Sequence, residues 1–351
     1  MSVRDRLTGR SIIVDDDMDA AFSDMYERGW TDGLPVIAPT RERVARMIDH
    51  VQLPPDLKIA RMAPGGGLAT VENIAINAVM AGCLPEYLPV VIAAVEALAQ
   101  PAFLLLGVQT TTNPVAPFVL INGPIRRLIG VNGGRGALGP GWRANATIGR
   151  AVRLAMLNLG GAIPGEIDKA THGFPGKYTF CTGELEEESP WEAFHVERGF
   201  RPEDSTVTVI ACQGTQSVVA AYLKPESILG MLVNAMAVWG TNSYFKGDGN
   251  PTVILTPRHA DIFHEAGWSK ARIREWLFEH TKVPLADFPA EPRIMAVSSE
   301  QKFDGDRVCI CKRAEDIAII VAGGPEAYHL SYLASYGNPL TMAKVRMPGE
   351  H

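Results

Sequence analysis

Residues 164–200 gather most of the side chains in this sequence that could do chemistry. The candidates for a catalytic role in this segment are His172, Lys177, Cys181, Glu187 and His195. Aromatic residues such as Trp191 and Phe194 accompany them, although a purely solvated loop has no need of large apolar rings. No helical or strand period organises the segment, so we expect a long functional loop held between packed elements.

Two kinds of catalysis are open to these residues. His195 can act as a general acid or base, because imidazole exchanges protons near neutral pH, and Glu187 can orient its ring. Cys181 can attack as a nucleophile if the nearby cations Lys177 and His172 favour its thiolate form. The alternatives are a solvated acidic face and an inert core cysteine.

A divalent metal is a third interpretation of the same loop. Glu184, Glu187 and His195 together offer the carboxylate and imidazole ligands that such ions bind. The cofactor stays unknown, because the sequence contains no HExxH, GxSxG, Walker A, EF-hand or CxxCH motif.

A glycine-rich loop at residues 130–143 indicates a place where a substrate could be held. It carries Trp142 and Arg143 and leads into a predicted helix over 144–159 whose first turn contains Asn145. A helix N-terminus beside arginine favours an anion such as a carboxylate. We therefore count Trp142, Arg143 and Asn145 as candidate substrate-binding residues.

Two further places could contact a ligand. The apolar run at 102–109 predicts a buried strand that ends in polar residues, among them Thr111 and Asn113. His259 follows a predicted strand at 250–257 and lies beside Arg258, where it could contact an anionic ligand.

The order of elements predicts an α/β protein. In the C-terminal half, β-branched runs at 204–214, 250–257 and 315–325 alternate with amphipathic helical segments. This alternation predicts a mostly parallel sheet there, after a mixed α/β N-terminal half with glycine-rich loops. We divide the chain into a helical arm at 1–58, an α/β domain at 59–200 and a second α/β domain at 201–351.

Composition limits the partners. The 39 acidic residues outnumber 33 Lys and Arg, which gives a net charge of −6 and argues against nucleic acid. Five cysteines without a CxxC spacing suit a reducing cytoplasm. The most apolar stretch, 84–108, is interrupted by prolines, so we expect no membrane partner. We expect a small-molecule substrate and a homo-oligomer.

Five motifs resemble those of a bacterial family of uncharacterised proteins related to the UGSC-motif (seleno)proteins. They are WTDGLPVIAPT at 30–40, NAVMAGCLPEYLPVV at 77–91, GPGWRANATIGRAVRL at 139–154, GKYTFC followed by SPWEAFHVERGF within 176–200, and VILTPRHADIFHEAGWSKARIREWLFEH at 253–280. The resemblance covers most of the chain and implies no particular activity. This sequence lacks the Cys-Gly-Ser-Cys tetrapeptide on which a redox role would rest.

These observations favour a cytoplasmic small-molecule enzyme. We expect a lyase or hydrolase that acts on a small polar or carboxylated substrate by general acid and base catalysis, with or without a divalent metal. The alternatives are a thiol-dependent redox protein that uses Cys181 and a ligand-binding subunit without chemistry.

Overall fold

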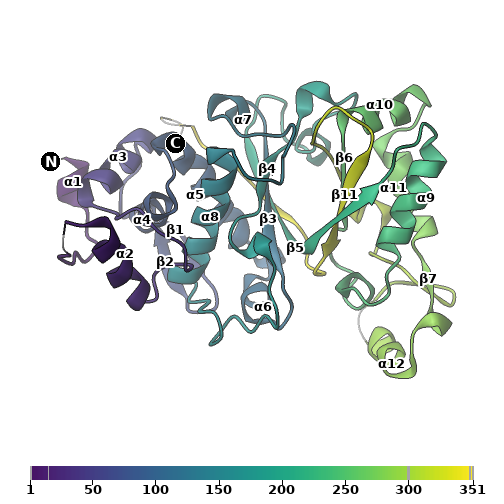
Figure 1. The fold of residues 1–351 in the computed structure, drawn as a ribbon, viewed down its shortest axis with the longest axis horizontal. Helices are drawn as coiled ribbons and strands as arrows, with labels where there is room; N and C mark the ends of the chain where they lie inside the picture. Colours follow the sequence, from purple (N-terminus) through teal and green to yellow (C-terminus); the bar gives the residue numbers. More distant parts are fainter. Residues whose placement is uncertain (1, 15, 299–300, 348, 350–351) are drawn as a thin grey trace.

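The computed structural model describes residues 2–14, 16–298, 301–347 and 349. About 40% of the chain is helix and 18% is strand, which confirms the predicted α/β class. One curled sheet lies in the middle of the molecule, with a helical layer on each side (Figure 1).

The central sheet has seven strands in the order β10-β6-β11-β5-β3-β4, and β12 also pairs with β5. Only β10 with β6 and β3 with β4 pair in parallel; every other pair in this sheet is antiparallel. The strands are β3 (Ala116–Asn122), β4 (Cys181–Gly183), β5 (Thr206–Val219), β6 (Thr252–Leu255), β10 (Ala318–Val321), β11 (His329–Ser335) and β12 (Thr341–Lys344).

The prediction of a mostly parallel sheet in the C-terminal half is wrong. The three strands expected there are present as β5, β6 and β10, but β11 lies between β5 and β6 and runs antiparallel to both. The sequence of β11, HLSYLAS, has little of the β-branched run that marked the other strands. The strands that the sequence pattern reveals suggest a parallel order. The strand that it does not reveal, β11, makes the sheet mixed.

The sheet curls until its two ends meet. Beyond β4, the amide of Leu185 donates a hydrogen bond of 2.8 Å to the carbonyl of Val321, the last residue of β10. Side chains alternate along each strand, so one face of the sheet points into the curl. The cluster on that face includes Phe118 and Leu120 of β3, Ile254 of β6 and Ile320 of β10. Phe194 joins it from the 164–200 segment, so that segment folds inward.

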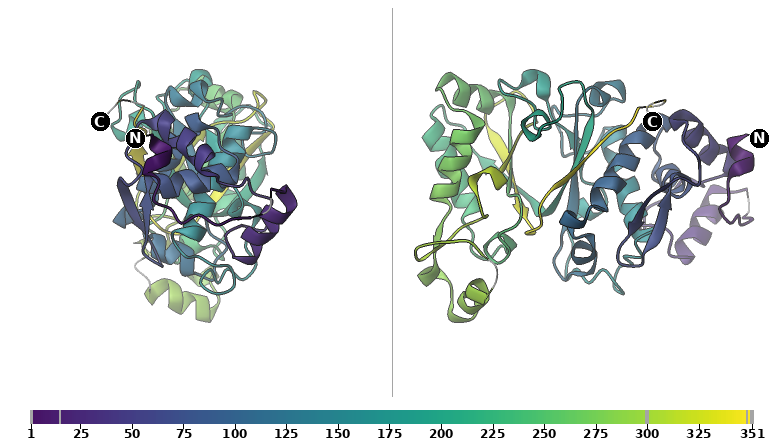
Figure 2. Two further views of the ribbon diagram at one scale, coloured as in Figure 1. Left: turned by 90° about the vertical axis from the view of Figure 1, so that its left-hand side faces the viewer. Right: turned by 180° about the vertical axis from the view of Figure 1, so that it is seen from behind.

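The outer face of the curl is covered by two separate groups of helices. One group packs on β3 and the first half of β5 and consists of α3 (Arg41–Val51), α4 (Val71–Ala81), α5 (Leu88–Leu98) and α8 (Arg143–Asn158). The other group packs on β6, β10 and β11 and consists of α9 (Pro225–Met236), α10 (Pro257–Glu265) and α11 (Lys270–His280). Both layers can be followed in Figure 2, seen from behind.

The remaining elements are short. They are α1 (Val3–Arg6), α2 (Met18–Glu27), α6 (Leu105–Thr110), α7 (Ile125–Leu128), α12 (Ala290–Ser298), the β1 (Lys58–Met62) and β2 (Gly67–Thr70) ribbon, and the small sheet of β7 (Val283–Pro284), β9 (Arg307–Val308) and β8 (Phe303–Asp304). Helix α12 stands away from the central sheet (Figures 1 and 2). The division into three domains stays a prediction, and β5 pairs with strands on both sides of its boundary at residue 200.

The prediction of a strand at residues 102–109 is wrong. This run forms the short helix α6, which begins after Leu104 adopts a left-handed conformation with a φ of 53°. A short apolar run without alternation fits a buried helix as well as a buried strand. The spacing of its apolar residues alone therefore could not distinguish the two.

The 164–200 segment contains no α-helix within the described residues. Three single turns and the three residues of β4 organise it: η3 (Pro175–Lys177), η4 (Glu186–Glu188) and η5 (Val196–Arg198). Apart from these it is irregular backbone that lies against the sheet.

No single helix in the described part of the chain is long and apolar enough to cross a membrane. The helices Pro85–Leu98 and Pro101–Thr110 reach the required length and composition only as a pair, and they meet at an angle of 69°.

The curled core predicts a matched pair of leucine substitutions. Leu120 is fully buried inside the curl, whereas Leu106 of α6 is exposed. Leu120→Ala should lower the free energy of unfolding by about 2–5 kcal/mol, because it leaves a cavity in the core. Leu106→Ala should change it by less than about 0.5 kcal/mol. Urea unfolding measures both, and equal effects would contradict the placement of Leu120.

Candidate functional site

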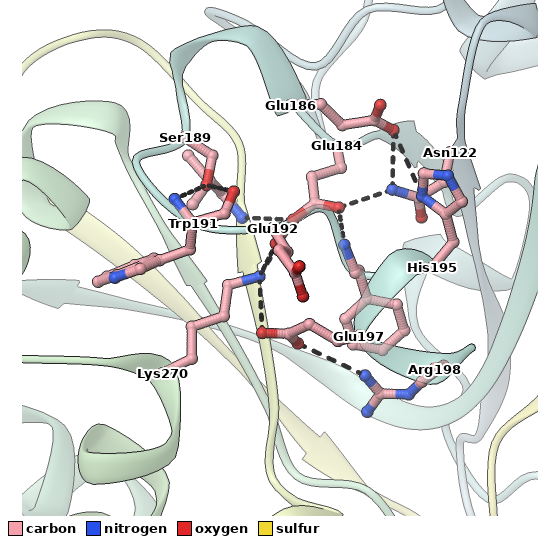
Figure 3. Close-up of polar contacts among 12 residues, drawn as sticks. Asn122, Glu184, Glu186, Ser189, Trp191, Glu192, His195, Glu197, Arg198 and Lys270 are labelled. Carbon is pink, nitrogen blue, oxygen red and sulfur yellow. Dashed lines mark hydrogen bonds and ion pairs between the residues drawn. The ribbon is translucent and has the colours of Figure 1, made fainter. Parts of the chain in front are cut away.

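A group of buried and partly buried polar side chains lies where the two ends of the curled sheet meet. We call it the seam cluster and define it as Asn122, Arg126, Glu184, Glu186, His195, Glu197, Lys270 and Arg274. Its members come from β3, α7, the 164–200 segment and α11, and most of them are drawn in Figure 3.

Glu184 follows β4 and is completely buried, with 0% of its surface exposed. Its carboxylate accepts hydrogen bonds from the Asn122 amide at 2.6 Å and from the backbone N–H of Phe194 at 2.7 Å. The Lys270 ammonium lies 3.8 Å away. Burial raises the pKa of Glu184 above its usual value, and the positive charge of Lys270 opposes this shift. Glu184 thus links β3, the loop and α11.

Lys270 and Arg274 extend the cluster into α11. They are one helical turn apart and therefore share a face of the helix. The Lys270 ammonium donates to the Glu192 carbonyl at 2.8 Å and lies 3.4 Å from Glu197. Arg274 binds the same carboxylate at 2.7 Å. Glu197 is consequently held by two cations from one helix.

Arg126 of α7 holds the acidic η4 turn in place. Its guanidinium donates to Glu186 at 3.0 Å and to Glu187 at 2.8 Å. Burial alone would raise the pKa of Glu187, but the hydrogen bond and charge of Arg126 outweigh it and lower that pKa. Glu186 also accepts from the N–H of Gly123 at 2.7 Å, so its carboxylate is fixed from several sides.

His195 is the most enclosed titratable ring of the 164–200 segment, with 1% of its surface exposed. Its Nδ1 lies 4.0 Å from a Glu186 carboxylate oxygen, which is too long for a hydrogen bond. Among the described residues neither ring nitrogen has a hydrogen-bond partner. The structure therefore brings together the predicted His195, Glu184 and Glu187, with Glu186 rather than Glu187 nearest to the imidazole.

Cys181 lies in a different environment. It is buried against Gly149 of α8, and burial raises the pKa of its thiol far above the usual value. The two cations expected to activate it are elsewhere engaged: Lys177 pairs with Asp168, and His172 is exposed. The arrangement does not favour a thiolate at Cys181.

The proposed metal ligands Glu184 and Glu187 have other partners in this arrangement, and the metal site stays a prediction. Glu187 turns toward arginines, and Glu184 accepts from an amide and a backbone N–H. Across the described ranges no three His, Cys, Asp or Glu side chains converge in a way that could hold an ion.

The residues predicted to bind substrate near the glycine-rich loop have structural partners instead. Arg143 donates to the Gly82 carbonyl at the end of α4, at 3.0 Å. Buried Asn145 bonds the backbone of Asn132 on both sides and so fastens the loop. Trp142 is partly exposed beside them.

Thr111 and His259 are also engaged locally, whereas the buried side-chain oxygen of Asn113 has no hydrogen-bond partner among the described residues. The Thr111 hydroxyl accepts from the N–H of Asn113 at 3.1 Å, in a turn that follows α6. His259 is buried in α10, where it bonds the Thr256 hydroxyl at 2.8 Å and the Ala220 carbonyl at 3.1 Å. Burial lowers the pKa of His259, which suits a neutral structural ring.

Sequence reasoning missed the cations of the seam cluster. One signal was available: the first turn of α11 carries Lys270 and Arg272 and no acid. Positive charge is unfavourable at a helix N-terminus, so a lysine there points to a buried acidic partner elsewhere. Arg126, Glu186 and Glu197 carried no comparable signal.

No protein-family model matches the chain, and no curated protein matches it. The similarity to the family related to the UGSC-motif proteins therefore stays a prediction.

The raised pKa of Glu184 predicts a pH dependence of stability. A carboxyl whose pKa is higher in the folded protein than in the unfolded chain binds its proton more tightly when folded. Its contribution to stability is therefore full below the usual glutamate pKa and is lost as pH rises through the raised value. The stability of the protein relative to Glu184→Gln, which cannot titrate, should decrease as pH rises.

Urea unfolding of both proteins between about pH 4 and pH 8 measures this difference. Glu188→Gln is the matched control, because Glu188 lies in the same loop but is exposed. A stability of wild type, relative to Glu184→Gln, that rises with pH would show that the folded protein favours the charged carboxylate.

Proposed function

We propose that this protein is a small-molecule enzyme, a lyase or hydrolase, in which His195 transfers protons and the Glu186 carboxylate stabilises the protonated ring. The single observation that carries the proposal is the enclosed His195 imidazole with two unpaired nitrogens beside a fixed carboxylate. The substrate class, a small polar or carboxylated molecule, rests on the sequence.

An unpaired buried imidazole is costly. A buried polar group without a hydrogen bond loses about 1–3 kcal/mol relative to one that keeps its partner. Proteins pair nearly all such groups, so the exceptions call for an explanation such as catalysis. His259 serves as the internal comparison, because both nitrogens of that buried ring are hydrogen-bonded. Of these two buried rings, His195 is the one whose nitrogens have no partner among the described residues.

The geometry supports a different role for each nitrogen. Nδ1 faces Glu186, whose carboxylate is held by Arg126, Asn122 and Gly123. Nε2 is left to take a proton from water in a hydrolase, or from a substrate C–H or O–H in a lyase. Glu186 would then stabilise the imidazolium, as a carboxylate does behind a catalytic histidine. The 4.0 Å gap would shorten as positive charge develops on the ring.

Substrate access requires a movement. His195 is almost fully buried, so a substrate reaches Nε2 only after a local movement, for which we propose the connection between η4 and η5. That connection is irregular backbone with two single turns, which opens at lower cost than a helix or a central strand.

A ligand-binding protein without chemistry is the second candidate function. A cavity of about 440 Å³ beside Arg198 favours it, since that volume suits a small molecule. Cys181 takes no part in either proposal, because burial disfavours its thiolate.

His195→Gln should abolish turnover of the best substrate found in a panel of small carboxylic esters, amides and hydroxy acids. The expected loss in kcat is about 10²–10⁴-fold, the usual contribution of general acid and base catalysis. The melting temperature should not fall, because the ring makes no hydrogen bond that the substitution could remove.

His264→Gln is the matched control, because His264 is exposed on α10, and it should retain full activity. Iodoacetamide should leave turnover intact, since the buried Cys181 is not the nucleophile. Turnover retained by His195→Gln would remove His195 from the mechanism. Absence of turnover across the whole panel would favour the second candidate function.

A further inference from the structure

We infer that the cavity beside Arg198 binds the carboxylate group of a small organic molecule. The cavity measures about 440 Å³ and lies between η5, the residues before β6, the turn η8 (Ala314–Asp316) and the residues before β12. Arg198 is its deepest cation. The inference concerns binding alone and stands whether or not His195 transfers protons.

Arg198 is a partly buried residue whose guanidinium has few partners. About 20% of its side chain is exposed, and its guanidinium lies 3.6 Å from the centre of the Phe194 ring. Its ion pair with Glu197 is long, at 3.9 Å. No shorter hydrogen bond or ion pair of this guanidinium is seen among the residues that the structure describes. Most of its five N–H donors are thus left to the cavity that it lines.

The carboxylate that pairs with Arg198 is also engaged by other cations. Glu197 is already bound by Arg274 at 2.7 Å and approached by Lys270 at 3.4 Å. Arg198 therefore shares the Glu197 carboxylate with two other cations. Burial, together with repulsion from Arg274, lowers the pKa of Arg198 to about 10, so the group is still a cation at neutral pH.

The other two cations of the cavity wall and its asparagine are paired with protein groups. Lys312 pairs with Asp248, and Arg313 pairs with Asp316 at 2.8 Å. The Asn250 amide bonds the Asp316 carbonyl and the N–H of Leu340. Arg198 is therefore the wall group with most to gain from a ligand.

The chemistry favours a carboxylate over a phosphate. A planar guanidinium stacked on a ring presents paired N–H donors that match the two oxygens of a carboxylate. A phosphate dianion would meet more repulsion than a carboxylate monoanion from the acidic residues Asp248, Glu315 and Asp316 of the wall. The wall also offers Leu340 and Pro339 to an apolar tail.

Calorimetric titration of the full-length protein with butyrate tests the inference, with the neutral isostere butyramide and inorganic phosphate as the comparison probes. Butyrate should bind at least about tenfold more tightly than either, because a hydrogen bond to a charged group outweighs a neutral one. Equal affinity for butyramide, or no binding of butyrate, would overturn the site. Tighter binding of phosphate would overturn the carboxylate assignment.

Arg198→Gln should weaken butyrate binding at least about tenfold, and Arg198→Lys should weaken it less, because lysine keeps the charge but loses the paired donors. Arg28→Gln is the matched control: Arg28 pairs with Asp24 at the end of α2 and lies outside the cavity. Unchanged affinity in Arg198→Gln would overturn the inference.

Phenylglyoxal labelling gives a second test on the unaltered protein, in case Arg198→Gln does not fold. Butyrate should protect Arg198 from modification, as read by mass spectrometry, while Arg28 stays equally labelled. Butyramide should give no protection. Labelling of Arg198 that butyrate does not change would contradict the site.

Discussion

The structure depends on one buried carboxylate, that of Glu184, which needs hydrogen bonds and a nearby cation where the ends of the curled sheet meet. Strands β4 and β10 come together here through a single backbone hydrogen bond, from Leu185 to Val321, rather than through a full ladder. Glu184 supplies the remaining links, to Asn122 on β3, to the N–H of Phe194 and toward Lys270 on α11. A charge removed from water costs several kcal/mol unless it is paired and hydrogen-bonded. The fold therefore has to keep β3, the loop and α11 in contact, and this constraint joins the two halves of the chain.

The seam cluster also surrounds His195 and Arg198, the two residues on which the proposals rest. His195 and Arg198 lie on one 3₁₀ turn, directly after Phe194, which is anchored inside the curl. On one side, the Arg126 and Glu186 pair fixes a carboxylate near the imidazole. On the other, Lys270 and Arg274 occupy Glu197 and leave Arg198 short of negative charge. A proton-transfer group and an anion-binding group thus follow from the same buried electrostatics, and the two proposals can fail separately.

The sequence predicted the α/β class and the inward fold of the 164–200 segment, because aromatic residues among charges do not suit a solvated loop. It also singled out His195. It could not predict the mixed sheet, since β11 lacks a β-branched run and strand direction depends on contacts between distant segments. It could not identify Arg126 or Lys270 as partners of loop glutamates, because a pairing across 60 or more residues leaves no local pattern. Cys181 and His259 were attractive by residue type alone, and burial gives both of them structural surroundings.

Hydrogen exchange at the Leu185 amide tests the closure of the sheet most directly. Val119 is the reference, because its N–H donates to Phe180 within the β3 and β4 pair. If the seam cluster closes the curl, Leu185 should exchange about as slowly as Val119, through an opening that costs nearly the full free energy of unfolding. Exchange of Leu185 at the rate of an exposed loop, while Val119 stays protected, would show that the two ends of the sheet separate freely and would contradict the account.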